Sequence, residues 1–304
     1  MDKLTPDEIR ARIRGPVCSF PTPFTRDGEI DEGASRRIID LAISGGSDII
    51  LLTYGDSLFT ILTDEEVARL TKLVAEQTGG RALVVAADRM WWTGKAVDFA
   101  VYCRGVGADV LMVRPPDWGG SATPESLAAH YAAVAGVMPV MLVGNVPFRT
   151  LEVLAETAPN VVAFKEDVSM DYAYRVARLY GDRWPMIAGG GKARHLMLWP
   201  AGVRASFSIH IHFAPEVTQA YWKVLEGGDL AEARRVVDTY DQPLFRMGET
   251  FSGGLDSLIH CAMEVFGVAS RWRRPPFVSA GEEDVERLRG FFQGAGLLKG
   301  KLCR

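Results

Sequence analysis

Short runs of apolar, often β-branched residues recur along the chain, separated by longer stretches in which apolar residues repeat every three or four positions. The short runs are almost continuously apolar, as in the strands of a parallel sheet that is covered on both faces. They predict eight strands, at residues 16–20, 48–53, 82–88, 110–114, 140–145, 161–165, 186–188 and 204–209. The stretches between them predict amphipathic helices, for example at residues 31–44, 64–77, 93–105, 124–136 and 170–180.

Several of the predicted helices begin with a capping sequence. Thr63 stands three residues before Glu66, as in a capping box, and Pro124 occupies the first position of a helix. Eight strands that alternate with helices are typical of a (β/α)8 TIM barrel, in the α/β class. An open, doubly wound sheet is the alternative, but its first strand–helix turn usually carries a glycine fingerprint, which residues 20–24 lack.

The strand pattern stops near residue 228. Beyond that point, residues 230–240, 254–266 and 282–292 predict helices, and an Arg-Pro-Pro turn at residues 274–276 separates the last two. We therefore expect a catalytic barrel domain over residues 1–228 and a C-terminal helical extension over residues 229–304.

The composition agrees with one large domain. The chain has 304 residues, of which 48% are hydrophobic, and its net charge of −4 is spread over mixed signs. This balance gives no indication of nucleic-acid or membrane binding. No apolar run is long enough for a membrane span or a secretory signal, and the cysteines lack the spacing of a metal site, so we expect a soluble cytoplasmic protein. The four cysteines are Cys18, Cys103, Cys261 and Cys303.

Lys165 ends the predicted sixth strand, directly after the apolar residues 161–164. In a TIM barrel, chemistry takes place at the C-terminal ends of the strands. An apolar surrounding disfavours the ammonium form of lysine, and a neutral lysine amine can attack a carbonyl carbon. The position therefore favours a Schiff-base lysine, although a lysine that leaves a strand for solvent is the ordinary alternative.

The ends of the other strands also carry polar residues or glycines. Because the glycines let a small substrate approach the backbone, these ends predict a small-molecule site around Lys165. The residues concerned are Thr53, Tyr54, Gly55, Asp56, Asp88, Arg89, Arg114, Gly144, Asn145, Gly189, Gly190, Gly191 and His210.

Two segments have alternative interpretations. His210 and His212 would lie on one face of an extended segment, as half of the zinc site of a metal-dependent hydrolase. Spacing reveals no third ligand, so we favour one histidine in the site, with His210 as the candidate, and one in a structural role. Residues 189–192, Gly-Gly-Gly-Lys, are a possible phosphate loop but lack the P-loop spacing.

Several segments match, in order and spacing, motifs of a known family. They are residues 15–28, residues 52–57 (Leu-Thr-Tyr-Gly-Asp-Ser), residues 62–66, residues 145–150 (Asn-Val-Pro-Phe-Arg-Thr), residues 161–166, and residues 274–276 with 282–283. Together they resemble the dihydrodipicolinate synthase and N-acetylneuraminate lyase family of class I, pyruvate-dependent aldolases, lyases and dehydratases. The surroundings of Lys165, with residues 202–203 and 213–216, are more similar to the sugar-acid dehydratase branch than to the lysine-biosynthesis branch.

The resemblance implies a role for each matching residue. Lys165 would form an imine with a 2-keto acid and withdraw electrons from the neighbouring carbon. Thr53 and Tyr54 would hold the carboxylate of the keto acid, and Arg149 would bind a second carboxylate at the mouth of the barrel. The other substrate-binding candidates are Asn145, Gly189, Gly190 and His210.

The chain departs from the family at two of these positions. Gly144 stands where relatives have a tyrosine that relays protons to the imine. Tyr54 replaces the second threonine of a Thr-Thr pair, and it either returns a phenol to the site from another strand or fills the space left by the glycine. We therefore count Tyr54, with Lys165, as a catalytic candidate.

We predict a class I lyase, either an aldolase or a dehydratase, that acts on pyruvate-like 2-keto acids or keto sugar acids through a Schiff base at Lys165. No cofactor or metal is implied, and the family resemblance implies a homo-oligomer, either a dimer or a homotetramer. One alternative is a catalytically lapsed binder of small carboxylates, which the loss of the tyrosine at position 144 favours. The other is a metal-dependent barrel hydrolase that uses His210 and His212.

Overall fold

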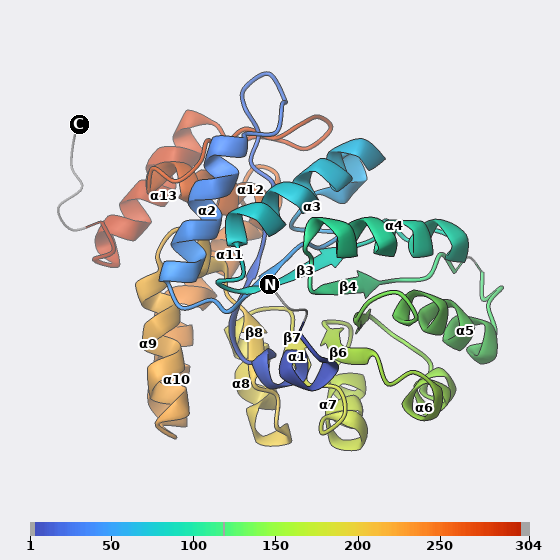
Figure 1. The fold of residues 1–304 in the computed structure, drawn as a ribbon. Coiled ribbons are helices and arrows are strands. Elements are labelled where there is room, and N and C mark those ends of the chain that lie inside the picture. The colour runs from blue at the N-terminus through green and yellow to red at the C-terminus, as the bar shows by residue number, and fades with distance from the viewer. Residues whose placement is uncertain (1–3, 118, 299–304) are drawn as a thin grey trace.

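The computed structural model describes residues 4–117 and 119–298. Within these residues, eight parallel strands pair in chain order and close into a barrel, because β8 pairs with β1 (Figure 1). The strands are β1 (Gly15–Ser19), β2 (Ile49–Leu51), β3 (Leu83–Ala87), β4 (Val110–Val113), β5 (Val140–Val143), β6 (Val161–Glu166), β7 (Met186–Ala188) and β8 (Ala205–Phe207). The predicted TIM barrel is confirmed, and the open sheet is excluded by the β1–β8 pairing.

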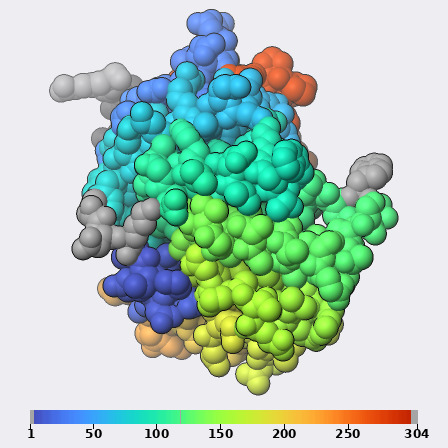
Figure 2. Space-filling model, turned by 45° about the vertical axis from the view of Figure 1, so that its right-hand side comes forward, coloured from blue at the N-terminus to red at the C-terminus, as the bar shows by residue number. Residues whose placement is uncertain are grey.

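Helices cover the outside of the barrel. They are α1 (Pro6–Arg12), α2 (Glu32–Ser44), α3 (Asp64–Thr78), α4 (Thr93–Val106), α5 (Pro124–Ala135), α6 (Phe148–Thr157), α7 (Met170–Tyr180), α8 (Lys192–Leu198) and α9 (Pro215–Glu226). Figure 2 shows α4 to α6 side by side on one face, in shades from turquoise to green. A capping box begins α3 at Thr63, as the sequence indicates, and the structure shows a second one at Thr123, directly before Pro124 of α5.

Three 3-10 helices, counted over the described residues, lie in the loops: η1 (Phe59–Ile61), η2 (Trp199–Ala201) and η3 (Ile209–His212). The C-terminal part consists of α10 (Leu230–Val236), the π-helical segment η4 (Val237–Asp241), α11 (Gln242–Gly248), α12 (Gly254–Val265) and α13 (Glu282–Gly294). The sequence predicted the first of these helices to end at residue 240. In the structure the helical path continues through η4 into α11, whose second residue is Pro243.

The strands are buried on both faces, which accounts for their continuously apolar sequences. Every residue of β3 and of β5 is buried, inside the barrel or beneath the helices. Cys18, Cys103 and Cys261 are buried free thiols, and Cys303 lies outside the described residues. Among the helices of the described residues, none combines the length and the apolar side chains that crossing a bilayer requires.

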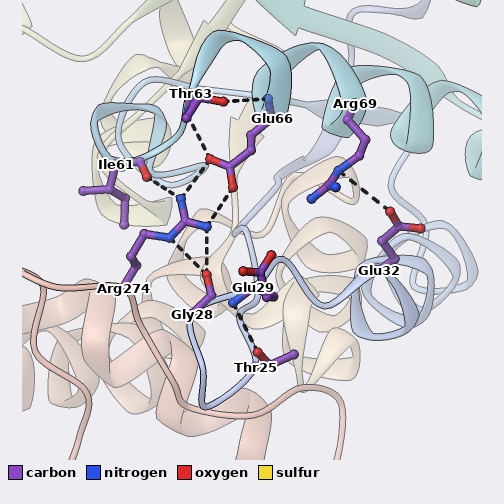
Figure 3. A network of polar contacts seen from close by, with 9 residues as sticks. All are labelled: Thr25, Gly28, Glu29, Glu32, Ile61, Thr63, Glu66, Arg69 and Arg274. Atoms are coloured by element: carbon purple, nitrogen blue, oxygen red, sulfur yellow. Dashed lines mark hydrogen bonds and ion pairs between the residues drawn. The ribbon is translucent and has the colours of Figure 1, made fainter.

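Arg274 fastens the C-terminal part of the chain to the first third of the barrel (Figure 3). Its guanidinium group binds both carboxylate oxygens of Glu66 at 2.8 Å and donates to the carbonyl oxygens of Gly28 and Ile61. Glu66 also accepts a hydrogen bond from the backbone N–H of Thr63 at the start of α3. A bidentate pair fixes direction as well as distance, so this contact holds the segment between α12 and α13 in place.

The C-terminal helices therefore lie against the barrel rather than apart from it. Helix α12 packs on η3, which follows β8, and η4 packs on α8. These contacts bring α11 and α12 to the C-terminal end of the barrel strands. The division of the chain at residue 228 stays a prediction.

Candidate active site

A cavity of about 500 Å³ lies at the C-terminal ends of the barrel strands. Residues that follow most of the strands form its floor and walls, and Phe245 of α11 and Ile259 of α12 close one side. This is the end of a TIM barrel at which enzymes carry their chemistry. The sequence predicted this location, whereas the contribution of the C-terminal helices was not foreseen.

Lys165 reaches this cavity from the end of β6. The residue is only 7% exposed, and its amine contacts the carboxylate of Asp167 and lies 5.1 Å from the centre of the Phe207 ring. Side chains two residues apart on an extended chain point to the same side, so β6 places both residues in the cavity. The structure thus gives the predicted nucleophile an anionic partner that the sequence analysis did not name.

Glu166, between these two residues, points the other way. Its buried carboxylate contacts Arg194 and accepts hydrogen bonds from the backbone N–H groups of Val168, at 2.6 Å, and Ser169, at 3.2 Å. These contacts close the turn that follows β6. Because Glu166 fixes this turn, Asp167 is held beside the lysine amine.

The loop after β2 is held in a tight conformation by Ser57. Its hydroxyl group accepts from the Thr53 N–H at 2.9 Å and donates to the carbonyl of Phe20 at 2.6 Å. The Thr53 hydroxyl oxygen accepts from the Asp56 N–H at 3.1 Å. Thr53 lines the cavity, where its hydroxyl group can also donate a hydrogen bond; its role in binding a carboxylate stays a prediction.

The phenol of Tyr54 also lines the cavity, but it donates to Asp88 at 2.9 Å. Burial raises the pKa of Asp88 to about 6, against the opposing effect of the hydrogen bonds from Tyr54 and from backbone N–H groups. Burial, followed by the charge of Asp88, raises the pKa of Tyr54 well above its ordinary value. The phenol therefore keeps its proton and directs it to Asp88 rather than to Lys165.

Asp56 is a second carboxyl group on the cavity wall. Burial raises its pKa, while a hydrogen bond from Ser19 and the charge of Lys165 act in the opposite direction. Asp56 is thus biased toward its protonated form. A carboxyl group of this kind can supply a proton to a leaving group.

Position 144, where the resembling family has a tyrosine, faces open space. Gly144 has a φ of +79°, and a Cβ atom added there would meet no atom within 4 Å. The space directly beside the Gly144 backbone is therefore open to the cavity, and Asn145 lines the cavity as predicted.

The structure corrects the expected position of Arg149. This residue lies in the first turn of α6, on the outer surface, with its side chain 63% exposed and paired with Glu152 at 3.1 Å and Glu125 at 3.8 Å. Helix α6 begins at Phe148, so Arg149 is its second residue, and its side chain does not line the cavity. The guanidinium group that lines the cavity belongs to Arg114, at the end of β4.

The structure also corrects the expected positions of His210 and His212. Residues 209–212 form the 3-10 helix η3, in which each residue turns by about 120° from the last, so His210 and His212 diverge. His212 lines the cavity, whereas His210 is buried outside it, 3.2 Å from Lys192 and 3.3 Å from Asp241. Over residues 4–117 and 119–298, no three His, Cys, Asp or Glu side chains gather into a metal site, and nothing favours the hydrolase alternative.

The three glycines after β7, at residues 189–191, have two different roles. Gly190 and Gly191 line the cavity, as expected for Gly190. Gly189 does not line it; a Cβ atom there would stand 2.6 Å from the Cβ of Asp167, so this glycine makes room for that carboxylate. Lys192 binds Asp241 at 2.7 Å in the interior, which removes it from any phosphate site in this loop.

Asp167 and His260 are among the cavity-lining residues that sequence reasoning missed. The sequence contained a signal for Asp167, because it stands two residues after Lys165 in an extended segment. It contained none for His260, since the place of this residue depends on how α12 packs on η3, which lies far earlier in the chain.

Comparisons with known proteins all point to the same family. The dihydrodipicolinate synthetase family matches residues 12–293. A probable 5-dehydro-4-deoxyglucarate dehydratase from Bradyrhizobium diazoefficiens is 30% identical over 298 residues, which cover 95% of this chain and 94% of that protein. A 4-hydroxy-tetrahydrodipicolinate synthase from Phenylobacterium zucineum is 29% identical over 302 residues, covering 95% of this chain and all of that protein.

Solved structures show the same fold. A prophage protein of the dihydrodipicolinic acid synthase family from E. coli K12, in complex with pyruvate, superposes with a TM-score of 0.81 at 20% identity, covering 93% of this chain and 99% of that one. An N-acetylneuraminate lyase from Mycoplasma synoviae does so with a TM-score of 0.81 at 19% identity, covering 95% and 99%.

Proposed function

The chain belongs to the dihydrodipicolinate synthetase family and is a lyase, and on this premise we propose that it removes water from a keto sugar acid through a Schiff base at Lys165. One observation carries the proposal: the Lys165 amine lies in the cavity at the barrel mouth, against the carboxylate of Asp167. A buried amine with a proton acceptor beside it is equipped to attack a ketone.

In the first step the amine adds to the ketone carbon of the substrate. Asp167 takes one proton from the ammonium group, which frees the nitrogen lone pair, and the carbon–nitrogen bond forms. Asp167 gives this proton to the oxygen of the adduct, takes a second proton from the nitrogen and gives that one to the same oxygen, which then leaves as water. The product is an iminium ion on Lys165, and no metal enters the balance.

In the second step the iminium ion withdraws electrons from the neighbouring methylene carbon. Asp167, which contacts the lysine nitrogen, takes a proton from that carbon and an enamine forms. The enamine expels the hydroxyl group from the next carbon, and Asp56 supplies the proton with which it leaves as water. Hydrolysis of the remaining imine restores Lys165.

The ends of the substrate are assigned from the cavity walls. The keto-acid carboxylate lies against the free hydroxyl proton of Thr53, and a second carboxylate meets the guanidinium group of Arg114. The dehydratase from B. diazoefficiens is named for a six-carbon acid with a carboxylate at each end, and its substrate class suits such a pair of anion-binding groups.

We further propose a cytoplasmic homo-oligomer, a dimer or a tetramer. Large apolar side chains are exposed on α7 and α8, which pack against one another: Tyr174, Leu179 and Met197. Large apolar side chains exposed on two neighbouring helices support contact between copies. Light scattering on the purified protein measures the assembly directly, and a monomer at micromolar concentration would refute it.

The proposed reaction is tested by incubating the protein with 5-dehydro-4-deoxyglucarate and following loss of the substrate and the products by mass spectrometry. Wild type should eliminate water, and Lys165→Met should lose at least 10⁴-fold in rate. Arg149→Ala, outside the cavity, is the control and should stay within about twofold. Release of pyruvate without elimination would replace the dehydratase with an aldolase, and no turnover of this acid or of related keto sugar acids would refute the proposal.

A further inference from the structure

The wall of the cavity between η3 and α12 carries two buried histidines that the proposed reaction does not use. His212 is 3% exposed and His260 is 2% exposed, and both line the cavity. They come from distant parts of the chain and lie near enough for a charge on one ring to affect the other. The C-terminal extension thus contributes a polar side chain to the site.

Their ring nitrogens lack partners. Over the described residues, neither Nδ1 nor Nε2 of His212 has a hydrogen bond, and Nδ1 of His260 has none. Backbone groups of Ser19 and Ile209 lie near the His212 ring without reaching hydrogen-bond geometry. These nitrogens are themselves buried, although both residues line the cavity. Buried polar atoms are normally paired, so unpaired ones in cavity-lining residues point to a ligand that the rings reach when it binds.

The buried surroundings of the two histidine rings indicate which kind of ligand they bind. Burial lowers the pKa of His212 to about 4, and burial with the charge of Arg273 lowers the pKa of His260 to about 3. Both rings are neutral at physiological pH, and a neutral imidazole offers one donor and one acceptor. A hydroxyl group offers the same two functions, whereas a carboxylate would leave the acceptor nitrogen unpaired.

We propose that His212 and His260 form a hydroxyl-binding subsite, which selects polyhydroxylated acids over plain acids of the same length. The subsite rests on the proposed function for the identity of the natural substrate. Hydroxyl binding by the two rings needs no imine, so it is measurable in the absence of turnover. The rings determine specificity and are not reacting groups.

Two six-carbon diacids test the subsite by titration calorimetry. D-Glucarate and adipate have the same length and the same carboxylates, and they differ only in four hydroxyl groups. Wild type should bind glucarate at least tenfold more tightly than adipate. His212→Phe and His260→Phe should each lower glucarate affinity by about tenfold and leave adipate affinity within about twofold. The glutamine variants at the same positions keep a donor and an acceptor and should recover part of the loss.

Two controls separate the possible causes. His130→Phe changes a buried histidine outside the cavity, which contacts Thr93, and should leave the ratio of the two affinities unchanged. Lys165→Met should also keep the ratio, because glucarate has no ketone to attack. A failure of the proposed Schiff-base reaction would therefore be detected in the activity test of Lys165→Met and would not affect this binding experiment. Equal affinities in wild type, equal losses for both acids, or no loss in either histidine variant would overturn the subsite.

Discussion

Lys165 and Asp167 stand two residues apart in the chain, and their charged groups meet inside the cavity, while Glu166 between them turns into the interior toward Arg194. Gly189 on the neighbouring strand end leaves the space that Asp167 occupies. The pair therefore depends on three local features: an extended backbone, a turn fixed by Glu166, and a glycine beside it.

If Asp167 transfers the protons, Asp167→Asn should lower kcat by about 10² to 10⁴-fold, the usual contribution of a general acid or base. The amide keeps the size of the side chain and removes its basicity, so the thermal midpoint should change little. Steady-state kinetics and a melting curve measure the two effects. A kcat within threefold of wild type would exclude Asp167 from the reaction.

Gly189→Ala, made alone and together with Asp167→Asn, tests whether Gly189 acts through Asp167. The added methyl group must displace Asp167, so kcat should fall in the wild-type background. In the Asp167→Asn background the same change should cost little more, because the carboxylate is already absent. Independent, additive losses would show that position 189 acts on something other than Asp167.

The buried carboxyl group of Asp88 predicts a pH dependence of stability. Its pKa is raised by burial from 3.8 to about 6, so between these values the folded state binds more protons than the unfolded state. The protonated carboxyl group therefore contributes to the free energy of unfolding. This contribution is fully present below about pH 4 and is lost as the pH rises through 6, and the total loss is up to about 3 kcal/mol. Asp88→Asn cannot ionise and should not show this loss.

Urea denaturation of both proteins from pH 4 to pH 7 measures this effect. Other titrating groups contribute equally to the two curves and cancel in the difference between them. The free energy of unfolding of Asp88→Asn should rise relative to wild type across this range. Parallel curves would mean that Asp88 has no raised pKa in the folded protein.

Gly144 tests whether the space of the missing family tyrosine is open. Its φ of +79° is left-handed, so any side chain there should cost about 1–2 kcal/mol of stability. Gly144→Ala measures this backbone cost alone. Gly144→Tyr should lose no more than the alanine variant, since nothing lies within 4 Å of the added Cβ. A much larger loss in denaturation midpoint for the tyrosine would show that the space is filled.

The ion pair of Lys192 with Asp241 joins the barrel to the C-terminal helices, and both side chains are at most 2% exposed. Lys192→Met leaves a buried carboxylate beside His210, so it should destabilise the fold by about 3–5 kcal/mol. The exposed pair Lys72–Glu76, at 3.7 Å, is the matched control, and Lys72→Met should cost no more than about 0.5 kcal/mol. Equal effects in chemical denaturation would contradict the structural role of the buried pair.

The sequence predicted the barrel and the position of Lys165 because both follow from local patterns. Continuous apolar runs identify buried parallel strands, and the ends of parallel strands converge at one edge. Thr53, Tyr54, Asn145 and Gly190 were placed in the cavity for the same reason, and the structure puts them there.

The errors arose where the local conformation was not an extended strand end. His210 and His212 were assigned to one face because residues 210–212 were expected to be extended after the eighth strand, but residues 209–212 form a 3-10 helix. Arg149 was assigned to the barrel mouth, but it lies in the first turn of α6, where its exposed side chain pairs with Glu152 and does not line the cavity. His260 was beyond reach, because the docking of α12 depends on tertiary packing rather than on any local pattern.

The central claim is the covalent chemistry of one amine, and borohydride trapping measures it most directly. The protein is incubated with pyruvate, and separately with 5-dehydro-4-deoxyglucarate, then reduced, digested and weighed by mass spectrometry. We predict one reduced adduct per chain, on the peptide that contains Lys165, and none in Lys165→Met. Absence of an adduct with both acids, or an adduct that persists on another lysine in Lys165→Met, would contradict the account.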